Sequence, residues 1–88
     1  MKKDIYKLAI KTYGMDAQLG MAQEECAELI VAINKLKRDK CTANHINFCE
    51  EVADVEIMLE QMRICFDNIL INKIKRQKIN RLKKRLSQ

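Results

Sequence analysis

The sequence has no proline and no tryptophan, only two glycines, and just two tyrosines and two phenylalanines among 88 residues. The absence of proline and the shortage of glycine remove the residues that most often interrupt helices. So few aromatic side chains leave little material for a β-sandwich or for a surface on which nucleic-acid bases stack. One histidine, with no paired Cys-x-x-Cys, argues against a structural zinc site. The composition therefore favours an all-α protein.

Disulfides and membrane spans are also not expected. The four cysteines show no regular spacing, and the first residues show no signal-peptide pattern. We therefore expect buried, reduced thiols and a cytoplasmic location. The longest uncharged runs are far shorter than a bilayer is thick, so no membrane partner is expected.

The net charge of +5 is unevenly distributed along the chain. Residues 73–88 hold eight of the 17 basic residues and none of the 12 acidic ones, so residues 1–72 carry nine basic and twelve acidic side chains. An acidic body with a basic tail suits a ligand made of metal and phosphate. It also suits a nucleic acid that is held by the tail alone.

Apolar residues recur at helical spacing over most of the chain. They predict helices over about 2–13, 16–38, 45–66 and 69–86, with a loop at 39–44 in which Thr42 or Asn44 caps the next helix. The expected fold is a single all-α domain over 1–88, a bundle of three or four helices. At this size we expect oligomerisation to complete the bundle, as a homodimer or homotetramer. The side chains predicted to face inward are Leu19, Ala22, Cys26, Leu29, Ile30, Ile33 and Leu36 in the second helix, and Phe48, Cys49, Val52, Val55, Leu59, Met62 and Phe66 in the third.

Two similar acidic motifs lie in the two long predicted helices. Residues 24–29 read Glu-Glu-Cys-Ala-Glu-Leu and residues 50–55 read Glu-Glu-Val-Ala-Asp-Val, 26 residues later. On a helical wheel each motif places an acidic pair, three residues apart, on the same side of its apolar stripe. If the stripes pack antiparallel, four carboxylates converge at one edge: Glu25, Glu28, Glu51 and Asp54.

Four acids at one edge require positive charge nearby, because like charges repel strongly where water is partly excluded. Mg²⁺, or Mn²⁺ in its place, prefers oxygen ligands and can also bind phosphate oxygens. An alternative choice of ligands pairs Glu24 with Glu28 and Glu50 with Asp54. Since Glu24 and Glu50 lie farther from the stripe, we rank them second, as outer ligands or as catalytic bases that orient water. A di-iron site is disfavoured because its Glu-x-x-His pairs are absent.

The spacing Glu25-x-x-Glu28, then 22 residues, then Glu51-x-x-Asp54 resembles the signature of MazG-like nucleoside triphosphate pyrophosphohydrolases, in particular their small, phage-type, single-domain members. The resemblance covers about residues 13–86. It implies Mg²⁺ held by the four acids and hydrolysis of ribo- or deoxyribonucleoside triphosphates to monophosphate and pyrophosphate. It also implies dimers or tetramers with sites between subunits, and it brings Gln18 close to the nucleobase or sugar. The preferred base and sugar, the number of metals and the oligomer size stay open.

The last predicted helix carries Lys78, Arg81 and Arg85 on one face, where they could bind the phosphate oxygens of a substrate. The plainer interpretation of these residues is a solvated amphipathic helix. They also suggest an alternative function, a non-enzymatic module that binds nucleic acid or another protein through the basic helix. Binding to nucleic acid is disfavoured because no recognition motif is present and the acidic helices would repel a duplex.

Overall fold

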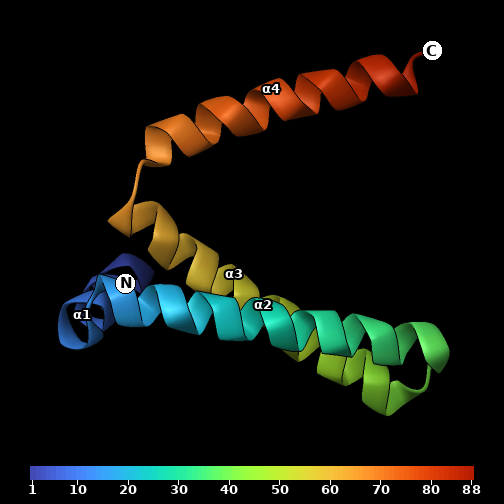
Figure 1. The fold of residues 1–88 in the computed structure, drawn as a ribbon, viewed down its shortest axis with the longest axis horizontal. Coiled ribbons are helices and arrows are strands. Elements are labelled where there is room, and N and C mark those ends of the chain that lie inside the picture. The colour runs from blue at the N-terminus through green and yellow to red at the C-terminus, as the bar shows by residue number, and fades with distance from the viewer.

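The computed structural model describes all residues 1–88 and consists of four α-helices without strands (Figure 1). Helix α1 spans Lys2–Tyr13, α2 Met15–Arg38, α3 Thr42–Cys65 and α4 Asn68–Leu86. The prediction of an all-α bundle is confirmed, and the predicted bounds of the helices agree to within three residues. None of the four helices combines the length and the apolar character that a membrane span requires.

The turns before and after α2 depend on particular residues. Gly14, between α1 and α2, has a φ of 91°, a value that side chains with a Cβ rarely adopt. In the loop after α2, the Asn44 amide donates hydrogen bonds to the carbonyl oxygens of Lys35 (3.3 Å) and Asp39 (2.9 Å). Asn44 therefore caps the end of α2. The prediction that Thr42 or Asn44 caps α3 was wrong, because the N-cap residue of α3 is Cys41 and no side chain caps the helix.

The junction between α3 and α4 is held by side chains at both of its ends. The Asp67 carboxylate accepts a hydrogen bond from the backbone N–H of Leu70 (2.9 Å) and so caps α4. From the last turn of α3, the Arg63 guanidinium donates to the side-chain oxygens of Asn68 (2.9 Å) and Asn72 (2.7 Å). Helix α4 contacts no helix other than α3, and beyond this junction it runs away from the α2–α3 pair (Figure 1).

Helices α2 and α3 form the main packing interface, and α1 lies across one end of it. Only five side chains are buried: Gln18, Ala32, Val55, Met58 and Gln61. On α2 the line of contact runs through Gln18, Glu25 and Ala32 at intervals of seven residues. It also includes one side of the predicted apolar stripe, since Ala22, Leu29 and Leu36 are half-buried. The interior positions predicted for the following residues were therefore wrong, since these side chains are exposed: Leu19, Cys26, Ile30, Ile33, Cys49, Leu59 and Phe66.

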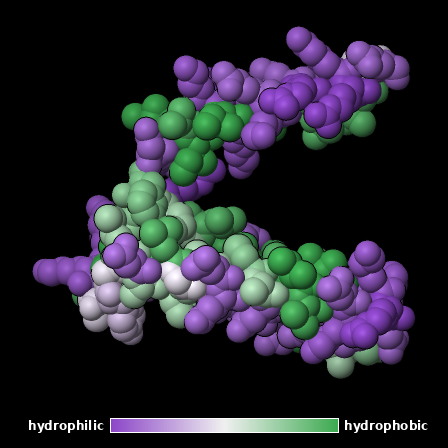
Figure 2. Space-filling view, in the orientation of Figure 1, coloured by the Kyte–Doolittle hydropathy of each residue, from purple (hydrophilic) through white to green (hydrophobic).

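The molecule consequently shows much apolar surface, visible as green areas over the α2–α3 pair and over α4 (Figure 2). The side chain of Ile30 is 60% exposed, that of Leu59 50% and that of Phe66 44%. All four cysteines are free thiols, and three of them are exposed, which corrects the expectation that they are buried. The predicted helices are present, but a single chain buries little apolar surface between them.

Candidate metal centre

A hydrogen bond between two buried glutamines shows how α2 and α3 align. The Gln18 amide donates to Oε1 of Gln61 over 2.6 Å, and the two helices run antiparallel. Glu25 follows Gln18 by seven residues, and Asp54 precedes Gln61 by seven, so these two carboxylates lie at the same level of the pair. By the same count Glu28 lies level with Glu51.

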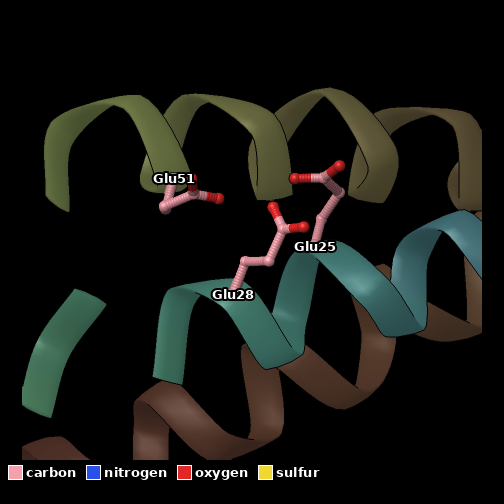
Figure 3. Close-up of side chains that lie close together, drawn as sticks. All are labelled: Glu25, Glu28 and Glu51. Atoms are coloured by element: carbon pink, nitrogen blue, oxygen red, sulfur yellow. The ribbon is translucent and has the colours of Figure 1, made fainter. Parts of the chain in front are cut away.

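Three carboxylates meet at this level. Glu25, Glu28 and Glu51 each present an oxygen that lies within 4.8 Å of the oxygens of the other two. Figure 3 shows the side chains of Glu25 and Glu28 on α2 and of Glu51 on α3 directed toward one another. The side chains of Glu25 and Glu51 are half-buried and that of Glu28 is exposed. The predicted convergence of acids from the two helices is therefore present for these three residues.

Burial and mutual repulsion make this group difficult to ionise. Burial raises the pKa of Glu25 above its ordinary value, and the charges of Glu28, Asp54 and Glu51 raise it further. The pKa of Glu51 is also raised, first by burial and then by the charges of Glu28 and Asp54. Asp54, half-buried on α3, thus belongs to the electrostatic group although its oxygens are not in the tight triad.

The chain supplies no positive charge to this group. The one ion pair in the structure joins the amino group of Met1 to Asp4, 3.6 Å apart. One oxygen of Glu25 and one of Glu51, Oε2 in each case, are buried without any hydrogen-bond partner. Buried carboxylate oxygens that lack a partner are costly unless a cation binds them. Carboxylate oxygens that lack both a hydrogen-bond partner and a neighbouring positive charge fit Mg²⁺ or Mn²⁺.

The two residues predicted as catalytic bases differ in their relation to the triad. Glu24 and Glu50 are both exposed, each next to a triad residue in the sequence. The charge of Glu50 contributes to the raised pKa of Glu51. Glu24 is not among the groups that raise the pKa of Glu25. Of the two, Glu50 is therefore the one that acts electrostatically on the acidic group.

The remaining predicted residues lie apart from the acids. Gln18 is only 5% exposed and bonded to Gln61, a buried residue to which the sequence pattern assigned no role. Gln61 follows Asp54 by seven residues, and Gln18 precedes Glu25 by seven. This matched spacing could have indicated from the sequence that Gln61 pairs with Gln18. The basic residues Lys78, Arg81 and Arg85 are exposed on α4, and the structure does not bring them to the acids of the same chain.

Comparison with known proteins found no match to this chain among protein-family models, curated proteins or solved structures.

Proposed function

We propose that this protein hydrolyses nucleoside triphosphates to monophosphates and pyrophosphate with the help of Mg²⁺, for which Mn²⁺ can substitute. The observation that carries the proposal is the triad of Glu25, Glu28 and Glu51 with its two buried, unpartnered oxygens. Asp54 completes the set of four acids that would hold the metal, since its charge acts on both half-buried glutamates. The bound metal would neutralise phosphate charge and lower the pKa of a water molecule.

The chain's own residues then have distinct roles. The carboxylate of Glu50, whose charge acts on Glu51, would accept a proton from water beside the triad, and Glu24 is the alternative. The Gln18–Gln61 pair lies one heptad away from Glu25 and Asp54, and Gln18 would approach the base or the sugar of the substrate through its amide group. Lys78, Arg81 and Arg85 would bind phosphate oxygens, with the guanidinium groups providing paired donors.

A second copy of the chain is part of this proposal. Only five of 88 residues are buried in one copy, and large apolar side chains on α2 and α3 face solvent. On the helical wheel, Ile30 on α2 and Leu59 on α3 lie on the flank opposite to Glu28 and Asp54. A partner that covers this flank would leave the acids accessible. We propose a homodimer or homotetramer, in the cytoplasm, in which the basic α4 of one copy reaches the acids of another.

The test is pyrophosphate release from the eight common ribo- and deoxyribonucleoside triphosphates, measured with Mg²⁺, with Mn²⁺ and with EDTA. We expect metal-dependent release that Glu51→Gln and Glu28→Gln each reduce by about a hundredfold or more. Glu56→Gln provides a matched control, because Glu56 is an exposed glutamate on α3 that does not belong to the acidic group. Equal activity in all variants, or none with any nucleotide, would argue against the proposal.

One observation favours a second candidate function. Helix α4 is basic, exposed along its length and in contact with α3 alone, as expected of an arm that binds nucleic acid. Fluorescence anisotropy with a labelled duplex, measured over a range of salt concentrations, separates the two functions. Binding that Arg81→Ala weakens and Glu51→Gln does not, in a protein without hydrolase activity, would support the nucleic-acid module.

A further inference from the structure

A second cluster of charged groups lies at the other end of α3, around a cavity between α1 and α3. The cavity measures about 430 Å³, within the range of roughly 300–1,000 Å³ that small-molecule sites occupy. It is lined by Lys2, Lys3, Tyr6, Lys7, Glu60, Arg63, Ile64 and Asn68, which we call the α1 pocket. It shares no residue with the acidic group, and Glu60 lies six residues beyond Asp54, about 9 Å along the helix.

The charge of the α1 pocket is strongly positive. Four of its lining side chains are cationic and one, Glu60, is anionic. None of the four cations forms an ion pair within the chain, because the one ion pair joins Met1 to Asp4. Lys2 and Lys3 also form the first turn of α1, the end of a helix that carries partial positive charge. The pocket therefore has an unbalanced charge that suits an anion with several negative charges.

Two half-buried residues give the pocket a defined wall. The carboxylate of Glu60 faces Tyr6, and its interaction with the phenol, followed by burial and by the charge of Glu60, raises the pKa of the Tyr6 hydroxyl. The one acid of the pocket therefore lies beside the phenol of Tyr6. Arg63 binds Asn68 and Asn72 through Nη1 alone. A guanidinium group has five N–H donors, so the others are free for a ligand.

We propose that the α1 pocket binds a small polyphosphate anion, such as inorganic pyrophosphate or tripolyphosphate, without the help of a metal. Arginine and lysine groups around a cavity provide the charge and the directed N–H donors that phosphate oxygens require. A concave site of this volume favours a compact anion over an extended nucleic acid. Because Arg63 also holds the first turns of α4, an anion bound to Arg63 would reinforce the α3–α4 junction.

The experiment is a titration of the full chain with pyrophosphate and with tripolyphosphate, in EDTA, followed residue by residue by ¹H–¹⁵N NMR. EDTA prevents the acidic group from binding the anion through a metal, so the result does not depend on the proposed hydrolase. We expect saturable shifts in residues 2–7 and 60–68. The double variant Lys3→Ala, Lys7→Ala should weaken binding by about tenfold or more.

Lys11→Ala is the matched control, since Lys11 is an exposed lysine of α1 that does not line the pocket. It should leave the affinity within about twofold, with all variants keeping the helical circular dichroism of the parent chain. Shifts confined to residues 73–86 would mean that the anion binds the basic arm instead. Equal weakening by Lys11→Ala would mean diffuse attraction to α1. Either result, or shifts that do not saturate, would overturn the proposal.

Discussion

The amide of Gln18 on α2 donates a 2.6 Å hydrogen bond to the side-chain oxygen of Gln61 on α3, and both residues are about 95% shielded from solvent. This contact lies one heptad away from Glu25 on one helix and Asp54 on the other. A buried amide pair of this kind favours one alignment of two helices, because any other alignment leaves the amides without partners. The glutamine pair thus helps to determine which carboxylates of α2 and α3 lie opposite one another.

Replacing Gln61 by leucine should destabilise the chain by about 1–3 kcal/mol, because the Gln18 amide loses its buried partner. The double variant Gln18→Leu, Gln61→Leu should recover much of this loss, since neither amide is then buried alone. Urea unfolding of the single and double variants measures the coupling. Gln23→Leu, at an exposed position of α2, should change the free energy of unfolding by less than about 0.5 kcal/mol. Strictly additive losses would show that the pair contributes no coupling.

The raised pKa values of Glu25 and Glu51 predict how stability depends on pH in the metal-free protein. The folded chain holds these two protons more tightly than the unfolded chain, in which the pKa is near the ordinary 4.5. The free energy of unfolding should therefore be greatest below this pH and should fall as the pH rises through the raised pKa values. Thermal unfolding in EDTA between pH 4 and 8 measures the slope.

Glu25→Gln and Glu51→Gln should each flatten this pH dependence, because an amide does not ionise. Glu56→Gln, outside the acidic group, should keep the slope of the parent chain. A parent protein that gains stability between pH 5 and 7 without metal would contradict the raised pKa values, because carboxylates with lowered pKa values would then dominate.

Addition of metal should reverse the loss of stability at neutral pH. A cation that binds only the folded chain stabilises it by about 2.7 kcal/mol when its free concentration is 100 times the dissociation constant. Mn²⁺ and Mg²⁺ should raise the melting temperature, and EDTA should remove the increase. The increase should be absent in Glu28→Gln and retained in Glu56→Gln. Equal increases in both variants would place any bound metal elsewhere in the molecule.

The exposed apolar flank predicts self-association. Ile30→Lys places a charge on a side chain that is 60% exposed on this flank, and it should weaken the oligomer by about tenfold or more. Sedimentation velocity and the dependence of the melting temperature on protein concentration both report this change. Thr12→Lys adds the same charge at an exposed polar position of α1, outside this flank, and should have little effect. A parent chain that stays monomeric at all concentrations would exclude the proposed second copy.

The stability of α4 should depend on its cap. Asp67→Ala removes the acceptor for the Leu70 N–H and should cost the helix about 1 kcal/mol, a roughly fivefold increase in local opening. Hydrogen exchange of the amides in residues 70–74 should accelerate accordingly, while the amides of α2 and α3 keep their rates. Asp39→Ala, in the loop before α3, is the control. Unchanged exchange in α4 would mean that Arg63 alone holds the junction.

The helices and the acidic group could be predicted from the sequence because both depend on local spacing. The shortage of glycine and the absence of proline favoured helices, and the spacing of apolar residues indicated their approximate ends. The two acidic motifs marked the level at which the helices meet. The face along which α2 and α3 pack could be predicted only in part. Ala22, Leu29 and Leu36 of the predicted apolar stripe are half-buried, whereas Leu19, Cys26, Ile30 and Ile33 are exposed. The seven-residue spacings from Gln18 to Glu25 and from Asp54 to Gln61 could have indicated the glutamine pair. The cap by Asn44 on the preceding helix depends on which segments become neighbours, and spacing within one helix does not contain that information.

The antiparallel alignment of α2 and α3 also determines where the chain can change length. One inserted residue turns the rest of a helix by about 100° and moves it about 1.5 Å along its axis. Between Gln18 and Glu28, or between Glu51 and Gln61, such an insertion would separate the glutamine pair from the carboxylates. In the loop formed by Asp39, Lys40 and Cys41, the same insertion would lengthen a surface connection and leave both helices aligned. Descendants of this chain can therefore vary in length at that loop, while the ten-residue spacings from Gln18 to Glu28 and from Glu51 to Gln61 must stay constant.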